Sequence, residues 1–308
     1  MKIYYHQTIG GNVGDDMNTA LWCRILPDID EIASADWLVG AGTIIDRRLN
    51  ALPGRKVVMG SGFRPGQERG VLHDDIRFAA VRGFLSAESC GLGRDVAVCD
   101  PGFLVDKLWP PAQPRSQGVA FIPHIYSEQY SNIAAAAADA GFEVISPTLP
   151  LEEFLRRLAG CARAYCESLH SAIFADAFRM PWARVRICSS HYEGRGVADF
   201  KWADTFSVFD MPSHSINRTV LVPVKRSWTL MRSGLRPLQA VLERRLVSEL
   251  AQRRDDATMF QLSDAGRLQE RVEELIARVQ QLRSVDSVDA WHAPPAAKRQ
   301  SPPAGAAR

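Results

Sequence analysis

The hydrophobic pattern of the chain alternates between short apolar runs and longer segments with helical spacing. Apolar runs in the first third predict strands at Ile3–His6, Trp37–Val39, Lys56–Met59, Phe78–Val81 and Val96–Cys99. Helical patterns between them predict helices at Asp15–Leu26, with Asp15 as N-cap, and at Gly83–Cys90. Alternation of this kind is typical of a parallel sheet covered by helices.

The same alternation starts again at Gly118. It predicts strands at Val119–Pro123, Phe142–Ile145, Ala162–Cys166 and Ala183–Ile187, and helices at Asn132–Ala140, Pro150–Leu158, Leu169–Phe178 and Asp199–Phe206. Residues 109–117 carry three prolines and little apolar content, which predicts a linker. We therefore expect an α/β protein with two Rossmann-like domains, residues 1–108 and 118–222. Ligands would bind where the carboxyl ends of the strands face the cleft between the domains.

The last third of the chain has a different pattern, and we expect residues 223–284 to form a helical extension. Residues 228–254 are basic and amphipathic, with predicted breaks at Gly234 and Pro237. This segment either packs on the body with a solvated basic face or contacts an anionic inner-membrane surface through residues 225–254. A 4-3-4-3 spacing then forms an apolar seam that would allow a homodimer through residues 268–282, at Leu268, Val272, Leu275, Val279 and Leu282. Residues 285–308 are rich in Pro, Ala and Ser, and we expect them to be disordered.

Composition and charge narrow the class of protein. Lys plus Arg number 37 and Asp plus Glu 35, and a net charge of +2 argues against a nucleic-acid-binding protein. No apolar run approaches the ~18 residues that cross a bilayer, and the first residues do not have the pattern of a signal peptide. The cysteines are scattered without a CxxC, which argues against a zinc site. These features predict a cytoplasmic protein without a metal ion.

Three glycine-rich segments follow predicted strands. Residues 10–16, which include Asn12 and Asp16, lie where a backbone can approach a ligand at a helix N-terminus, although they match neither GxGxxG nor a Walker motif. Residues 40–43 and 60–66 could form the floor of a cleft, with Arg64 reaching an anion. Each segment can equally be a structural turn.

Two further segments carry candidate chemistry. Arg82 ends a predicted strand, where its guanidinium suits a carboxylate or phosphate, although a surface arginine is the alternative. Residues 99–102 are interpreted as a structural turn. In residues 165–175, Glu167, Ser168 and His170 stand between a strand and an apolar helix. The helix N-terminus lowers the pKa of His170 and Glu167 opposes this, so His170 is an acid/base candidate or a structural histidine.

The order of these segments resembles the polysaccharide pyruvyltransferase family, in particular members that complete bacterial exopolysaccharides such as succinoglycan. The resemblance rests on six short motifs and a closing helix, at residues 11–18, 38–44, 57–62, 81–83, 99–101, 167–173 and 200–204. It implies a two-domain arrangement like that of GT-B glycosyltransferases. It also implies transfer of pyruvate from phosphoenolpyruvate to a sugar of a lipid-linked repeat unit. The product would be a cyclic ketal across two hydroxyls, with phosphate released.

The resemblance also implies roles for residues of this chain. His170 would be the acid/base, Glu167 would orient either His170 or the sugar, and Arg82 would hold the donor. Other substrate contacts would come from Asn12 and Asp16 on the acceptor side, Lys201 as a second cation, and Gly42, Ser61, Arg64, His124 and Ser168. Many relatives carry an arginine where this chain has Ser168, so that anion contact would come from Arg64 or Arg195 or would be absent. No cofactor other than the phosphoenolpyruvate donor is expected.

Two other functions remain open at this point. A GT-B-like cleft would equally suit a nucleotide-sugar glycosyltransferase of polysaccharide biosynthesis. The C-terminal helices would suit a non-catalytic partner of the polysaccharide assembly machinery, for which His170 would be dispensable.

Overall fold

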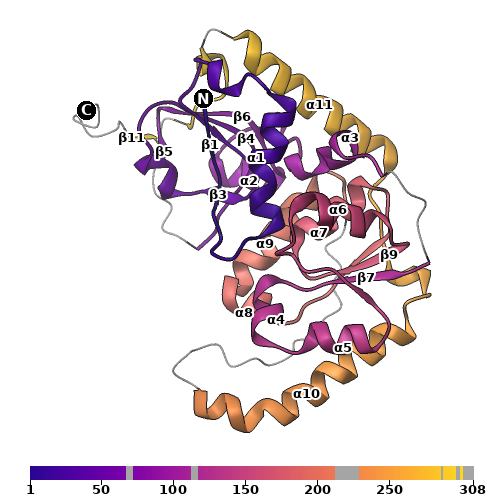
Figure 1. Cartoon of the computed structure of the whole chain (residues 1–308). Helices are drawn as coiled ribbons and strands as arrows, with labels where there is room; N and C mark the ends of the chain where they lie inside the picture. The colour runs from indigo at the N-terminus through magenta and orange to yellow at the C-terminus, as the bar shows by residue number, and fades with distance from the viewer. Residues whose placement is uncertain (67–71, 112–116, 212–228, 286, 296–298, 301–308) are drawn as a thin grey trace.

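Two parallel β-sheets form the framework of the molecule (Figure 1). The structure is a computed structural model that describes residues 1–66, 72–111, 117–211, 229–285, 287–295 and 299–300. The prediction of an α/β protein with parallel strands is confirmed. The domain boundaries stay predictions, since most of the expected linker and residues 212–228 lie outside the described residues.

The first sheet holds the strands of the N-terminal half. Its members are β1 (Lys2–Tyr4), β2 (Trp37–Val39), β3 (Thr43–Ile45), β4 (Lys56–Phe63) and β6 (Ile76–Val81). Parallel partners flank β4, which is buried from Lys56 to Gly62, as expected for a strand covered on both faces. The prediction of a turn at residues 60–66 is therefore wrong for residues 60–63, which belong to β4. Gly60 has a φ of +86° at a shift in register, and only a residue without a side chain fits this bend beside Pro101.

The predicted strand Val96–Cys99 is also wrong. A 3₁₀ helix, η3 (Arg94–Val96), precedes one isolated bridge from Ala97 to Val81. A second 3₁₀ helix, η4 (Pro101–Leu104), begins immediately afterwards with Asp100 as its N-cap. The segment between the two helices is buried, but one bridge is its only ladder contact among the described residues.

The second sheet has the order β10-β9-β7-β8, with every neighbouring pair parallel. These strands are β7 (Val119–Ile122), β8 (Glu143–Val144), β9 (Arg163–Cys166) and β10 (Trp182–Arg184). They lie within the four predicted segments, except that β10 begins one residue earlier. The sheets account for both series of apolar runs in the sequence.

Helices cover the two sheets. They are α1 (Val13–Ile25), α2 (Phe84–Cys90), α3 (Val105–Leu108), α4 (Ile125–Tyr130), α5 (Ile133–Asp139), α6 (Leu151–Ala159), α7 (Leu169–Ala177), α8 (Ser189–Glu193) and α9 (Arg195–Ser207). Asn12, and not Asp15, is the N-cap of α1, because its side chain accepts from the N–H of Gly14 at 3.3 Å. The carboxylate of Asp15 instead accepts from the side chains of Thr8 and Asn12.

Contacts between the two halves are made largely by α7 and α9. Although α9 follows the second sheet in sequence, it packs against α2 and β4 of the first half. Trp202 and Phe206 of α9 belong to an apolar core that includes residues of both sheets. This crossing brings Lys201 and Asp204 to the edge of the first sheet.

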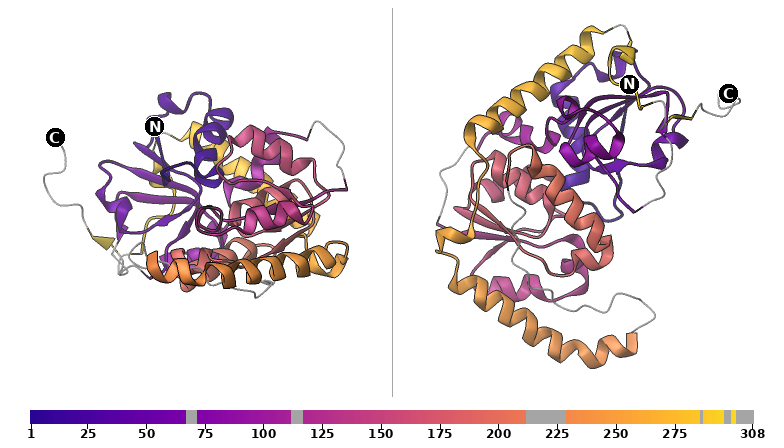
Figure 2. Two further views of the ribbon diagram at one scale, coloured as in Figure 1. Left: turned by 60° about the horizontal axis from the view of Figure 1, so that its bottom comes forward. Right: turned by 180° about the vertical axis from the view of Figure 1, so that it is seen from behind.

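Two long helices follow the second sheet: α10 (Thr229–Gln252) and α11 (Ala265–Ser284), which lie at opposite ends of the molecule (Figures 1 and 2). The predicted breaks in α10 are wrong, because the helix continues through Pro237, where one backbone donor is lost. Leu246, Val247 and Leu250 anchor α10 against α5. The five seam residues of α11 are buried in the core of the same chain, against β6 and η4. The apolar seam therefore packs within the chain, which leaves no exposed seam for the expected homodimer.

The expectation of a disordered tail from residue 285 is wrong for the described part of it. Val288 is fully buried in a 3₁₀ helix, η7 (Val288–Ala290), and the carbonyl of His292 accepts from the N–H of Phe78 at 2.8 Å. A short strand, β11 (Arg299–Gln300), pairs with β5 (Leu72–His73). Residues 301–308 lie outside the described residues. Within the described part of the chain, no helix is both long and apolar enough to cross a membrane.

Candidate active site

A cavity of about 260 Å³ lies between the two halves of the molecule. The first half contributes the loop before α1, the start of β3 and the end of β6, and the second half contributes the N-termini of α4 and α7 together with α8 and α9. Eight of the predicted site residues line it: Asn12, Gly42, Arg64, Arg82, His124, Ser168, His170 and Lys201. Arg82 and His170 therefore reach one cavity from opposite halves.

The side chain of Arg82 is held in a fixed orientation at the end of β6. Its Nε donates to Asp204 Oδ2 at 3.0 Å and its Nη1 donates to Thr43 Oγ1 at 3.0 Å. Buried Nη2 has no hydrogen-bond partner among the described residues. A Cβ at Gly62 would lie 2.2 Å from Nη2, so the guanidinium requires glycine at that position. An orphaned guanidinium donor at a cavity wall is suited to an anionic ligand.

His170 lies in the first turn of α7, with its side chain 12% exposed. Burial, helped by the charges of Arg82 and Lys201 and opposed by Asp15, lowers its pKa to about 4. The imidazole is therefore neutral at pH 7 and able to accept a proton. Its buried Nε2 has no hydrogen-bond partner among the described residues and lies 3.8 Å from Asp100 Oδ1.

Asp100 is a functional candidate that sequence reasoning missed. The carboxyl group is fully buried, with Oδ1 accepting from the N–H of Gly102 at 2.9 Å and Oδ2 lacking a partner among the described residues. Burial raises its pKa to about 6, although the nearby Arg82 charge lowers it. Its place in the motif at residues 99–101 was a signal, but an aspartate before proline is equally the cap of a turn and was interpreted as one.

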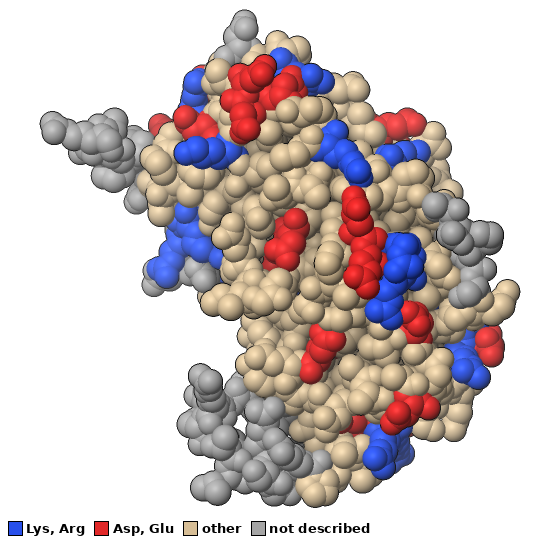
Figure 3. Space-filling view, in the orientation of Figure 1, with Lys and Arg blue, Asp and Glu red and all other residues tan. Residues whose placement is uncertain are grey.

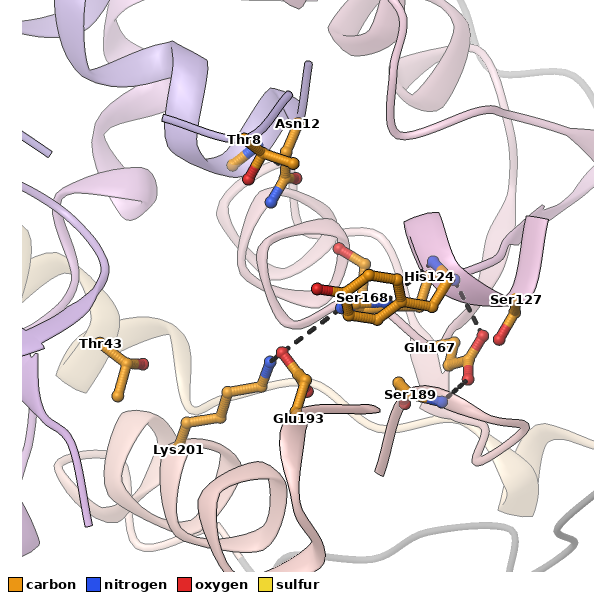
Figure 4. Close-up of polar contacts among 12 residues, drawn as sticks. Thr8, Asn12, Thr43, His124, Ser127, Glu167, Ser168, Ser189, Glu193 and Lys201 are labelled. Carbon is orange, nitrogen blue, oxygen red and sulfur yellow. Dashed lines mark hydrogen bonds and ion pairs between the residues drawn. The ribbon is translucent and has the colours of Figure 1, made fainter. Parts of the chain in front are cut away.

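A second ionic group lines the cavity on the side of α8 and α9 (Figure 4). Lys201 forms an ion pair with Glu193, and His124 Nε2 lies 3.4 Å from the same carboxylate. Burial alone would raise the pKa of Glu193, but Lys201 and His124 hold it well below its usual range. His124 Nδ1 accepts from the N–H of Tyr126, so its proton lies on Nε2 and points to Glu193. Glu193 therefore fixes two cavity-lining side chains, Lys201 and His124, and the sequence analysis did not identify it.

Three predicted site residues do not line the cavity. Glu167 accepts from the backbone N–H groups of His124, Ile187, Cys188 and Ser189, so it fixes two loops and not His170 (Figure 4). Ser61 donates to backbone carbonyls of the adjacent strand, at 3.2 Å for Val39. Asp16 is exposed and accepts from the N–H of Asn12 at 2.8 Å. The side chain of Arg195 lies outside the described residues.

Cations outnumber carboxylates among the charged side chains that line the cavity, and Arg82 is paired with Asp204, which lies behind the lining. Arg48, Arg64, Arg82 and Lys201 face two carboxylates, Asp15 and Glu193. Arg48 is paired with Asp46 outside this set, whereas Arg64 makes no ion pair with any described residue. Nowhere in the described part of the chain do three or more His, Cys, Asp or Glu side chains gather to hold a metal ion. The site is built to attract a small anion.

Gly14 provides a test of the packing around His170. A Cβ at Gly14 would lie 2.0 Å from His170 Nδ1, so we expect Gly14→Ala to displace the imidazole and lower kcat at least about tenfold, because small misplacements at reacting groups are costly. Steady-state kinetics would measure this change. Gly160→Ala, where the new methyl group makes only ordinary contacts, is the control. Equal activity of the two variants would show that His170 is not part of the machinery.

Comparison with known proteins identifies the family. The family model described as polysaccharide pyruvyl transferase matches residues 34–189, half of the chain, and this range includes Arg82, Asp100 and His170. The chain belongs to the polysaccharide pyruvyl transferase family. It is also 35% identical over 214 residues to the succinoglycan biosynthesis protein ExoV of Rhizobium meliloti (strain 1021), which covers 66% of this chain and 63% of that relative. The chain thus spans slightly less than two thirds of the length of the relative. No solved structure matches it.

Proposed function

We propose that this member of the polysaccharide pyruvyl transferase family transfers pyruvate from phosphoenolpyruvate to two hydroxyls of an exopolysaccharide sugar. The observation that carries the proposal is the placement of a neutral, buried His170 and an orphaned Arg82 donor in the lining of one cavity. The ExoV relative, a succinoglycan biosynthesis protein, supports exopolysaccharide as the acceptor class.

The donor fits the cationic side of the cavity. Phosphoenolpyruvate carries a carboxylate and a phosphate on the same carbon atom, C2, and two cations can each contact one of these anionic groups. Arg82 supplies the buried contact, and Arg64, without an ion-pair partner among the described residues, supplies the second. Ser168, which stands where many relatives have arginine, caps α7 by accepting from the N–H of Ser171. Arg64 therefore takes over the anion contact.

The chemistry requires one proton carrier. As the first sugar hydroxyl forms its bond to C2 of the donor, the neutral imidazole of His170 accepts the hydroxyl proton. In the same step the imidazolium delivers this proton to C3, so that the electron pair of the C2=C3 double bond forms the new C–H bond and C3 becomes the methyl group of the product. The second hydroxyl then displaces phosphate at C2, and its proton leaves with the phosphate. Arg82 and Arg64 stabilise the negative charge on the departing group.

Asp100 is proposed as the positioning partner of His170. Its carboxylate faces Nε2 and stabilises the imidazolium that forms during transfer, which requires Asp100 to be ionised. With a pKa of about 6, Asp100 loses its charge below that pH, whereas His170 would titrate only near pH 4. We therefore assign the fall of kcat at acid pH to protonation of Asp100.

The variant Asp100→Asn tests this role by two opposite effects. We expect kcat to fall about 100-fold and the acid limb near pH 6 to disappear. The same variant should also change stability. Folding raises the pKa of Asp100, so between about pH 4 and 6 the native state binds more protons than the unfolded state. Above that range the buried carboxylate is charged and destabilises the fold.

Asparagine removes this destabilising charge, so the free energy of unfolding at pH 8 should rise by about 1–3 kcal/mol, with no gain below pH 4. Urea titrations and kcat profiles measure both effects. An unchanged acid limb would contradict the assignment.

The finer features of the family resemblance are proposals of the same kind. We propose that the two sheets, with α9 crossing back to the first half, correspond to a GT-B-like arrangement of two domains.

We also propose that the protein acts in the cytoplasm on a lipid-linked acceptor at the inner membrane. Leu238 and Val241 of α10 are 56% and 62% exposed, beside the exposed Arg244 and Arg245, and this face suits an anionic membrane surface. Equal sedimentation with neutral and anionic vesicles would contradict the membrane contact.

Calorimetry separates this function from glycosyl transfer. We expect phosphoenolpyruvate to bind the full-length protein and a panel of nucleotide sugars not to compete with it. Binding of a nucleotide sugar, with no heat from phosphoenolpyruvate, would instead establish a nucleotide-sugar glycosyltransferase.

A further inference from the structure

A second cavity of about 540 Å³ opens directly beside the first. Its walls are residues 6–11, which lead into α1, and the exposed side of α4 with Thr148. His6, Thr8, Ile125 and Tyr126 line both cavities, so the two spaces share a wall. A ligand that extends out of the first cavity along this wall enters the second.

The chemistry of the second cavity differs from that of the first. Its described lining contains no lysine or arginine, and the surface over the loop before α1 and over α4 is largely uncharged (Figures 1 and 3). The polar groups there are the amides of Gln7 and Gln129, the hydroxyl of Thr148 and the carboxylate of Glu128. Glu128 accepts from Ser146 Oγ at 2.7 Å, and that hydroxyl is 2.8 Å from Thr148 Oγ1. Amides, hydroxyls and a single carboxylate suit an uncharged, hydroxyl-rich ligand and not an anion.

An aromatic surface lies where the two cavities join. Tyr126 packs against Tyr192 with ring centroids 4.8 Å apart, and Tyr192 stacks on Tyr130 at 5.0 Å with an interplanar angle of 17°. Because Tyr126 lies within this group of rings, its ring is held in place without a ligand. A fixed aromatic face beside hydrogen-bonding groups suits the apolar face and rim hydroxyls of a sugar ring.

We propose that the second cavity is the subsite for the acceptor glycan, and that it binds uncharged sugar units adjoining the one that is modified. Tyr126 lies under the sugar at the junction, and Glu128 and Gln129 bind its neighbours. This inference rests on the proposed function, since it assigns the donor to the first cavity. It makes the length of the acceptor a determinant of rate: a longer oligosaccharide fills both cavities, and a monosaccharide fills only the first.

The test uses the full-length protein and the lipid-free oligosaccharide released from the cell's lipid-linked fraction. The variants are Gln129→Ala, at an exposed position, and Glu128→Gln, which removes a charge at constant size. Each should weaken glycan binding in calorimetry about tenfold, because Gln129→Ala removes hydrogen bonds to the sugar and Glu128→Gln replaces a charged acceptor by an amide donor. Phosphoenolpyruvate affinity should stay within about twofold of the unsubstituted protein. Gln252→Ala, an exposed glutamine at the end of α10, is the matched control.

The outcomes separate this inference from the proposed function. Glycan binding that is equal in all variants, or absent when phosphoenolpyruvate binds, overturns the subsite and leaves pyruvyl transfer standing. Glycan binding that depends on Gln129 and Glu128, without any binding of phosphoenolpyruvate, supports a glycan site and overturns the donor assignment. The same variants should raise KM for the oligosaccharide without changing KM for phosphoenolpyruvate.

Discussion

Replacement of His170 by glutamine should abolish pyruvyl transfer, with kcat lowered by about 10³-fold or more. The neutral imidazole is the proton carrier of the proposed reaction, and glutamine fills a similar space but cannot accept and release a proton near neutral pH. Burial holds the pKa of His170 at about 4, so the native imidazole is ready to accept a proton throughout the physiological range. Single-turnover measurements with saturating phosphoenolpyruvate would determine the loss.

Binding measurements separate a chemical role of His170 from a structural one. Phosphoenolpyruvate should bind His170→Gln within about threefold of its normal affinity, because the cations that hold it are unchanged. His73→Gln, at a histidine in β5 that lines neither cavity, is the control and should keep full activity. If His170→Gln retained more than about a tenth of kcat, the proton-carrier role would be wrong.

The second large effect is expected at Arg82. Arg82→Lys keeps the charge but loses the planar fork, so phosphoenolpyruvate binding should weaken by about 10- to 100-fold, the value of one charge-assisted hydrogen bond. The loss should appear in KM more than in kcat. Titration calorimetry with phosphoenolpyruvate and steady-state kinetics measure the two quantities.

Arg82 is also one partner of a fully buried ion pair, so stability must be measured beside affinity. Asp204→Asn disturbs the same pair from the other side and leaves the guanidinium in place. Both variants should lower the free energy of unfolding in urea, by up to about 3–5 kcal/mol where a charge is left without its partner. Only Arg82→Lys should lose affinity for phosphoenolpyruvate. Equal losses of affinity in the two variants would mean that Arg82 holds the fold together and does not contact the donor.

The repeated strand–helix pattern was sufficient to predict both sheets, because buried parallel strands are continuous apolar runs. Short elements such as β5 and β11 were missed, since two-residue strands leave no pattern. The 4-3 seam of α11 was interpreted as a surface between two copies of the chain. The same spacing also occurs in a helix that packs on the core of its own chain, and α11 does so through residues such as Leu275.

For the site, the sequence predicted groups at strand and helix ends but not the groups that meet them in space. Arg82 and His170 stand at such ends, and both reach the cavity. Asp204 is distant in sequence from Arg82, and only the crossing of α9 brings the two together. Glu167 precedes His170 by only three residues in sequence, and for that reason it was expected to contact His170. Its carboxylate faces backbone N–H groups of a neighbouring segment instead.

Product analysis tests the central claim most directly. The full-length protein is incubated with phosphoenolpyruvate and lipid-linked oligosaccharide from cells, and the products are followed by phosphorus NMR and mass spectrometry. The account predicts one inorganic phosphate for each cyclic pyruvate ketal formed on the sugar, and neither product with His170→Gln. Unchanged phosphoenolpyruvate in the presence of an intact acceptor, or ketal formation that is equally fast without His170, would contradict it.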